Sequence, residues 1–207
     1  MRRLCLLGFL FVAISENARA DIIFSNFGPG DSYGSVAWQV GTTFVTQNAA
    51  ARFTLGPTDM FFSSAQIAVF SAVQPNLLTF QVLTNDGSNL PGTVLENLAA
   101  SNIPTSPSVI TFDATSPLLL SANTTYWLAS DVYGAGDFGW MYNSTGETGL
   151  ATRLDLGPWI GGTSSGDPTP AFRINGTSAA VPEPPTLALV GIGLVVLWGY
   201  SRFKNRV

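Results

Sequence analysis

Short runs of alternating apolar and polar side chains fill residues 21–180, and none of them has a sustained helical period. Gly, Pro, Asn, Asp and Ser interrupt the runs at roughly the 8–12-residue spacing that is typical of sandwiches and barrels. Turn signals stand at Asn85-Asp86-Gly87 and Leu90-Pro91-Gly92. The pattern predicts an all-β domain, an antiparallel β-sandwich of the jelly-roll kind. The expected strands are Ile22–Ser25, Ser35–Val40, Thr42–Thr46, Ala51–Leu55, Ser64–Phe70, Leu77–Leu83, Val94–Leu98, Val109–Phe112, Leu118–Leu120, Thr125–Ser130, Phe138–Tyr142, Ala151–Leu154 and Ala171–Ile174.

Residues 1–20 are typical of a secretory signal peptide. Two arginines precede the apolar run Leu4–Ile14, which is too short to span a bilayer. Ala18 and Ala20 form the small-x-small pattern that signal peptidase recognises, so we expect cleavage after Ala20. A buried core helix, the alternative, would need neither the arginines nor the alanine pair. Cleavage removes Cys5, the single cysteine of the chain, and with it any disulfide.

Residues 181–207 contain three parts in order. The proline-dense stretch Val181-Pro182-Glu183-Pro184 comes first, and the apolar run 187–200 follows. The chain then ends with Arg202, Lys204 and Arg206 among other residues. The apolar run predicts a short transmembrane helix, and the positive end predicts that this terminus is cytoplasmic with the domain outside.

This three-part tail resembles the PEP-CTERM sorting signal of Gram-negative bacteria. The resemblance implies processing by an exosortase, a membrane transpeptidase that cuts near the motif. The freed protein is then expected at the cell surface or in the extracellular matrix. The basic end departs from a solid arginine run, because Phe203 and Asn205 stand between its charges. A plain membrane anchor behind a proline-rich linker is the alternative.

The middle of the chain also resembles a known bacterial family, the choice-of-anchor R domain. The similarity covers most of residues 26–175 and implies a secreted β-sandwich with no established activity. It rests on the segments Asn26–Tyr33, Val82–Gly87, Leu90–Gly92, Leu118–Leu128 and Pro170–Ile174.

Charge and composition exclude several kinds of function. Residues 21–180 contain eleven carboxylates, three arginines and no lysine, a net charge of −8. Nucleic acid is therefore not expected as a partner, because phosphate binding needs Lys and Arg. The chain has no histidine, which removes His-based catalysis and His-ligated metals. We expect no enzyme activity and no cofactor, apart from a structural calcium ion that carboxylates could hold.

Asp131 and Asp137, with Asp155 as a third ligand, form the main calcium hypothesis. Gly134 and Gly136 would let backbone carbonyls approach the ion. The alternative, which we favour, is a solvated glycine-rich loop between strands.

Asp86 could bind calcium together with Asn85 and Asn89, but their spacing does not fit an EF-hand loop. The same residues make a good β-turn, which is the interpretation that we favour. Asn-x-Ser/Thr acceptors for N-glycosylation occur at Asn123, Asn143 and Asn175. The tail points to a bacterium, so we treat them as chance or as surface-loop chemistry.

Trp127, Trp140 and Tyr142 are the candidates for stacking on sugar rings. Side chains alternate along a strand, so in pairs such as Tyr126-Trp127 one neighbour must face outward. Aromatic residues in strands are nevertheless more often part of the core, which is the alternative that we favour.

Glu96 and Glu147 are the only glutamates in residues 21–180, and a carboxylate pair could hydrolyse glycosides. Both lie near expected turns or strand ends, where a side chain is usually solvated. We therefore predict a secreted, non-enzymatic surface or matrix protein that is associated with exopolysaccharide. A carbohydrate-binding module and a cryptic glycoside hydrolase are the alternatives.

Overall fold

The computed structural model describes residues 20–41, 46–71, 77–131, 137–162 and 166–179. The signal peptide up to residue 19, the expected membrane helix at 187–200 and residues 42–45 of one expected strand lie outside these ranges. Within the described ranges, no helix is long and apolar enough to cross a membrane.

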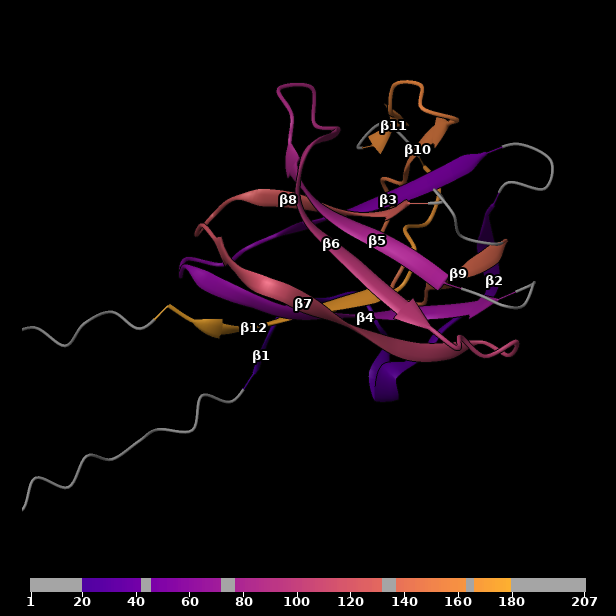
Figure 1. The fold of residues 1–207 in the computed structure, drawn as a ribbon, viewed down its shortest axis with the longest axis horizontal. Helices are drawn as coiled ribbons and strands as arrows, with labels where there is room; N and C mark the ends of the chain where they lie inside the picture. Colours follow the sequence, from indigo (N-terminus) through magenta and orange to yellow (C-terminus); the bar gives the residue numbers. More distant parts are fainter. Residues whose placement is uncertain (1–19, 42–45, 72–76, 132–136, 163–165, 180–207) are drawn as a thin grey trace, which may run out of the picture.

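Two antiparallel sheets pack face to face (Figure 1) and confirm the predicted all-β sandwich. The first sheet has the order β1 (Asp21–Ser25), β12 (Phe172–Ser178), β4 (Met60–Ser71), β9 (Phe138–Asn143) and β2 (Tyr33–Val40), and β7 (Ser108–Leu120) also pairs with β4. The second sheet has the order β11 (Ile160–Gly161), β10 (Ala151–Leu154), β3 (Gln47–Thr54), β8 (Thr125–Asp131), β5 (Leu77–Asn85) and β6 (Pro91–Ser101).

The alternation of apolar residues fills the space between the sheets with aromatic rings. Phe80 of the second sheet meets Trp140 of the first edge-on, with ring centroids 4.9 Å apart and planes at 87°. Phe112 and Phe138 also contact Phe80 edge-on, at 5.0 and 5.7 Å. Rings packed in this way bury large apolar areas and gain about 1 kcal/mol per pair beyond that burial. These contacts join the two sheets into one core.

A part of the outer face of each sheet is covered as well. On the second sheet, Trp127 packs with Leu83 and three buried alanines beneath Leu90 and Trp159. On the first sheet, Met141 and Ala68 lie in a cluster with Phe27. Residues that point away from the central core can therefore still be fully buried.

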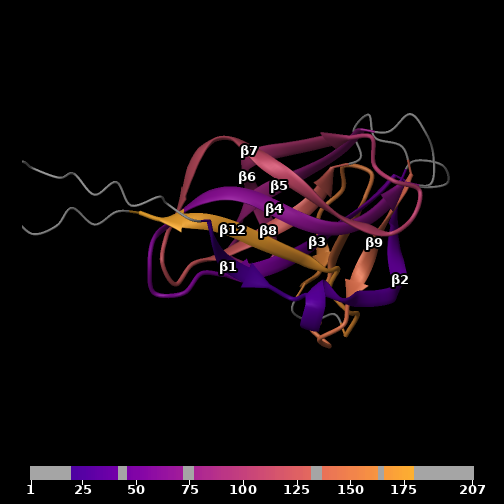
Figure 2. The ribbon, with the colours of Figure 1, turned by 90° about the horizontal axis from the view of Figure 1, so that it is seen from below.

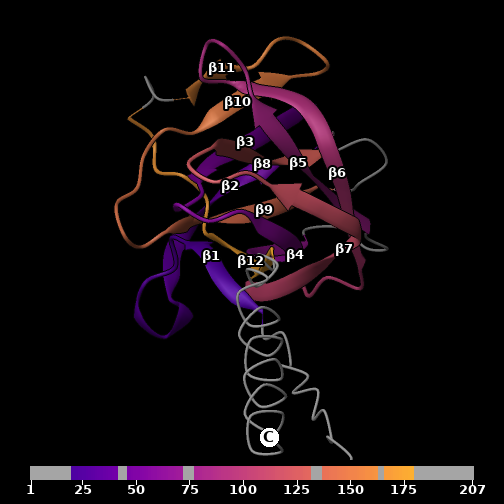
Figure 3. The same cartoon turned by 90° about the vertical axis from the view of Figure 1, so that its left-hand side faces the viewer.

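The first and the last strand of the domain, β1 and β12, lie side by side. The strand pairing sets Asp21 at the start of β1 opposite Gly176 of β12. Figure 2 shows β12 running between β1 and β4, and Figure 3 shows β1, β12, β4 and β7 meeting at the end from which the chain leaves. Any C-terminal signal therefore begins at the end of β12, beside the start of β1.

Candidate functional site

The last strand delivers the chain directly to the sorting stretch. β12 pairs with β1 as far as Gly176, opposite Asp21, and with β4 as far as Ser178, opposite Met60. The backbone N–H of Ala179 then donates to the carbonyl of Asp59 at 3.0 Å. Folded structure thus extends to within two residues of Val181, the first residue of the Val-Pro-Glu-Pro stretch. Residues 180–207, including Pro182, Glu183 and Pro184, lie outside the described ranges.

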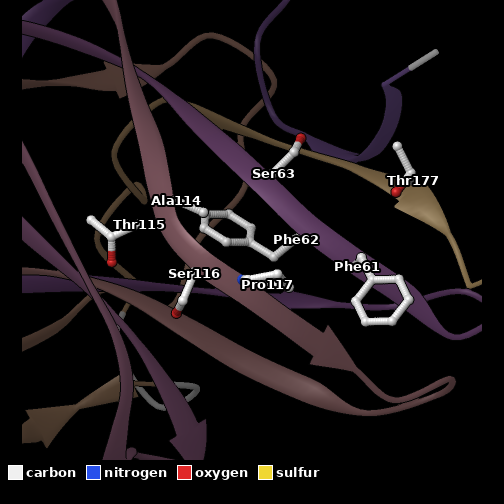
Figure 4. Close-up of a pocket in the computed structure, with 8 residues that line it drawn as sticks. All are labelled: Phe61, Phe62, Ser63, Ala114, Thr115, Ser116, Pro117 and Thr177. Atoms are coloured by element: carbon white, nitrogen blue, oxygen red, sulfur yellow. The ribbon is translucent and has the colours of Figure 1, made fainter. Parts of the chain in front are cut away.

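An open hollow of about 280 Å³ lies at the same end of the molecule (Figure 4). Phe61, Phe62 and Ser63 of β4 line it, together with residues 114–117 of β7 and Thr177 of β12. β7 bulges here, because four of its residues, 114–117, face only Ser63 on β4. The hollow is lined by rings, hydroxyls and backbone, and no charged residue lines it.

Glu96 reaches across from β6 of the second sheet to hold this bulge. One carboxylate oxygen accepts hydrogen bonds from the backbone N–H of Thr115 at 2.9 Å and from its hydroxyl at 2.5 Å. The other accepts the hydroxyl hydrogen of Ser116 at 2.9 Å. Burial alone would raise the pKa of Glu96, but these hydrogen bonds outweigh it and hold the pKa below its ordinary value. Glu96 is thus a structural link between two edge strands.

The expectation that Glu96 is solvated is wrong, since only 6% of the residue is exposed. Its carboxylate is ionised and engaged in three hydrogen bonds, which does not suit a general acid. Glu147 is exposed in the loop after β9 of the first sheet, as expected. The two glutamates thus occupy different elements and different environments.

Trp127 and Trp140, two of the three sugar-stacking candidates, are fully buried, so the stacking hypothesis is wrong for them. Trp140 belongs to the core between the sheets, and its indole N–H donates to the carbonyl of Ala171 at 3.0 Å. Trp127 faces outward from the second sheet, but Leu90, in the turn that joins β5 to β6, packs against it. Its indole N–H donates to the side-chain oxygen of Asn85 at 2.8 Å. Neither ring has a face to offer to a ligand.

Tyr142, the third candidate, is partly exposed at the end of β9. Burial, and secondly the charge of Asp167, raise the pKa of its phenol above the ordinary value. An ionisable ring beside a carboxylate could contact a sugar, so this part of the hypothesis stays a prediction.

The three calcium candidates lie in different surroundings. Asp131 ends β8 on the second sheet, where it accepts a hydrogen bond from Gln81 at 3.2 Å. Asp137 stands just before β9 of the first sheet, with its carboxylate against Gly41. Among the described residues, no three acidic side chains are grouped to hold a metal, so Asp155 does not join the other two.

A calcium site with only Asp131 and Asp137 as side-chain ligands stays a prediction, because the loop between them, with Gly134 and Gly136, lies outside the described residues.

Asp86 forms the turn that its sequence predicts. Its carboxylate accepts the backbone N–H of Ser88 at 2.8 Å and of Leu90 at 2.7 Å. Asn89 completes the hairpin with a positive φ of 60°. One carboxylate oxygen, Oδ1, accepts both hydrogen bonds and closes the loop between β5 and β6.

Asn143 organises the loop after β9, a role that the sequence analysis missed. Its side-chain oxygen accepts the backbone N–H of Thr145, Gly146 and Glu147 at 2.8–3.0 Å. Its amide donates to the carbonyls of Glu147 at 2.8 Å and Thr169 at 2.6 Å. Asn143 is buried, which agrees with treating its glycosylation sequence as chance. The Asn-x-Ser/Thr pattern therefore contains a residue that matters for the structure of the loop and not for glycosylation.

Arg153 is the other unexpected group. Its guanidinium lies over the ring of Trp159, 4.7 Å from the centroid. Burial lowers its pKa from the ordinary value, and the charge of Asp131 opposes that shift. Arg153 therefore stacks on Trp159, one of the rings that cover the outer face of the second sheet. Its positive charge also partly balances that of Asp131.

The fold and the position of its last strand define a class: a β-sandwich followed directly by a C-terminal targeting segment. Residues 180–202 match the PEP-CTERM protein-sorting motif, which supports an exosortase-sorted secreted protein. The motif implies export and transient membrane anchoring before sorting to the cell surface. No curated protein matches the chain. The resemblance of residues 26–175 to the choice-of-anchor R domain lies outside the matched range and stays a prediction.

Proposed function

We propose that the sorted product is a non-enzymatic component of the cell surface or extracellular matrix, where it associates with exopolysaccharide. The observation that carries the proposal is the sorting motif placed directly behind a folded acidic domain. The net charge of −8 over residues 21–180, without lysine, suits contact with acidic polysaccharide through bridging cations.

The non-enzymatic part of the proposal has support from the two glutamates. Glu96 is engaged in holding the β7 bulge, and Glu147 is solvated in a loop. A glycosidase needs two carboxylates facing one sugar, with one of them protonated near neutral pH. The lowered pKa of Glu96 does not suit the protonated member of such a pair.

The test follows the protein in the producing cells. Intact mass is measured for protein from the envelope, the medium and the polysaccharide fraction. We expect the processed protein to lack residues 187–207 and to sediment with polysaccharide. Digesting the polysaccharide, or removing divalent cations, should release it. A variant with Pro182, Glu183 and Pro184 all changed to alanine should keep its tail and stay in the membrane.

Three outcomes would contradict the proposal. Processed protein that stays soluble in the presence of polysaccharide would remove the matrix association. Reducing sugar released by the purified protein, and lost in Glu96→Gln or Glu147→Gln, would show a hydrolase instead. Unprocessed tails in the native protein would show a plain anchor.

Sugar binding at Tyr142 is a second candidate, favoured by its partly exposed ring beside Asp167. Tyr142→Ala should then weaken sedimentation with polysaccharide, and Phe61→Ala, an exposed ring elsewhere, should not. An equal effect of both variants would exclude a specific role for Tyr142.

A further inference from the structure

Three large apolar side chains are exposed where the chain leaves the domain. Exposed fractions are 60% for Ile22, 39% for Phe61 and 48% for Leu119. Phe61 pairs with Leu119 on one side and with Thr177 on the other, and Ile22 pairs with Asn175. Opposite residues in an antiparallel pair lie on the same side of a sheet, so all three share one outer surface. We call these three residues the tail-side face.

The tail-side face adjoins the start of the sorting segment. Thr177, which pairs with Phe61, lies two residues before Ala179, the last described residue. Seven residues separate Ala179 from the apolar run that begins at Leu187. A fully extended chain of that length spans at most about 28 Å. While the apolar run is in a membrane, Ala179 must stay within that distance of the hydrocarbon core. Thr177 and Asn175, which pair with Phe61 and Ile22, lie two and four residues before Ala179.

We propose that the tail-side face contacts the lipid surface of the membrane that holds the tail, until exosortase processing releases the domain. The proposal rests on the transient anchoring that the motif implies. Apolar and aromatic side chains are stabilised at the boundary between headgroups and acyl chains, because burial there removes their apolar surface from water. The tail in the membrane keeps the domain close to the lipid, and three apolar side chains alone would not be enough to hold it there.

The charges near the tail-side face indicate which lipid headgroups it can lie against. The described acids nearest to it in sequence are Asp21 and Asp59, and the domain as a whole carries a net charge of −8. A basic patch for anionic lipid would require a cluster of Lys and Arg, whereas residues 21–180 contain no lysine and three arginines, of which Arg173 on β12 pairs with Asp31. The contact is therefore apolar, and zwitterionic lipid suits it better than anionic lipid.

A comparison surface exists at another part of the domain. Leu154, Leu156 and Ile160 are exposed at 53%, 68% and 58% near β10 and β11. Figure 3 shows β10 and β11 on the opposite side of the molecule from β1 and β12. These residues match the tail-side face in exposure and chemistry and differ from it in their distance from the tail.

The experiment uses the mature full chain, residues 21–207, reconstituted in phosphatidylcholine vesicles. It contains no cysteine, so single-cysteine variants can each carry one environment-sensitive fluorophore. The probe positions are Phe61→Cys and Leu119→Cys, with Leu156→Cys as the matched control. Lipids with nitroxide near the headgroup report contact, and iodide reports exposure to water. Thermal unfolding of each variant checks that it is folded.

We expect nitroxide lipids to quench the labels at 61 and 119, and iodide to quench the label at 156. Adding phosphatidylglycerol should reduce the lipid quenching at 61 and 119. Equal lipid quenching at all three positions, or none at 61 and 119, would overturn the proposal. Shielding from iodide without lipid quenching would also overturn it, because a second copy or the tail itself would then cover the face. Polysaccharide sedimentation of the processed product tests the proposed function separately, since that product lacks the tail.

Discussion

At the scale of single residues, buried polar side chains hold together segments that backbone pairing does not join. The carboxylate of Glu96 connects β6 of one sheet to the bulge in β7 of the other. Each hydrogen bond to an ionised carboxylate contributes about 1.5–3 kcal/mol and leaves an unpaired group when its partner is lost. These few contacts therefore carry more stability than their number suggests.

Replacing Glu96 with Gln should lower the free energy of unfolding by about 2 kcal/mol at neutral pH, since the charge that strengthens these hydrogen bonds is lost. Glu147→Gln, at an exposed position, should change it by less than about 0.5 kcal/mol. Urea denaturation at pH 7 measures both. A Gln variant as stable as the parent would show that the ionised carboxylate is not the stabilising species.

The same residue predicts an acid dependence. The pKa of Glu96 is lower in the folded state than its ordinary value of 4.5. Its contribution is complete above that unfolded pKa and is lost as pH falls through the folded pKa. Between about pH 5 and about pH 3, the parent should therefore lose stability faster than the Glu96→Gln variant. Parallel pH curves would contradict this assignment.

Asn143 gives a third residue-scale prediction. Asn143→Ala removes hydrogen bonds to three backbone N–H groups and to two carbonyls, and should cost about 3 kcal/mol. Asn97 is exposed on β6 and hydrogen-bonds to Gln81, so Asn97→Ala is the control, with a cost below about 1 kcal/mol. Thermal unfolding compares them. Similar losses would show that burial of Asn143 does not set its importance.

At the scale of elements, one glycine sets the spacing between β9 and β4. A Cβ on Gly139 would collide with the ring of Phe70, its partner across the strands. Gly139→Ala should destabilise the domain by about 1–3 kcal/mol through overpacking. The double variant Gly139→Ala/Phe70→Leu should recover part of that loss, because the smaller side chain leaves room. Additive losses in this double-mutant cycle would contradict the contact.

The sequence predicted those elements whose signals are local. Alternation located β5 and β10, and Asp-Gly chemistry located the hairpin at Asp86. The sequence predicts two strands, Val109–Phe112 and Leu118–Leu120, where the structure has the single strand β7. In the structure, pairing with β4 continues on both sides of a bulge. β11 has two residues and depends on its pairing with β10, so no local pattern could indicate it.

The sites were less predictable than the strands. Alternation correctly indicated that Tyr126 and Trp127 point to opposite sides of their sheet. It could not show that Leu90 and Trp159, distant in sequence, cover Trp127. The partners of Glu96 likewise come from a bulge on another strand 19 residues away. Only the sorting motif, which is contiguous in the chain, could be identified from the sequence by itself.

At the scale of the whole molecule, repulsion within the net negative charge destabilises the folded domain. The eleven carboxylates of residues 21–180 outnumber three arginines, although Arg173 pairs with Asp31. Raising NaCl from 0.01 M to about 0.15 M shortens the Debye length from about 30 Å to about 8 Å. Tm should then rise by about 2–4 °C if screening relieves about 1 kcal/mol of repulsion.

A matched variant separates repulsion from other effects of salt. Asp113→Asn, at an exposed position on β7, should raise Tm at low salt and reduce the further gain from added salt. Differential scanning calorimetry measures both. A Tm that falls as salt rises would show that attractive ion pairs outweigh the net repulsion.

The position of β12 also decides how the domain responds to mechanical load. A pull on the tail acts along a strand that is bonded to β4 through seven residue pairs and to β1 through four. If the opposite pole of the domain is held by matrix, the hydrogen bonds on both sides of β12 share the load in shear. A strand at the edge of a sheet, pulled sideways, would instead give way one bond after another. For as long as the tail anchors the chain, β12 is therefore the strand through which a pull on the tail enters the domain.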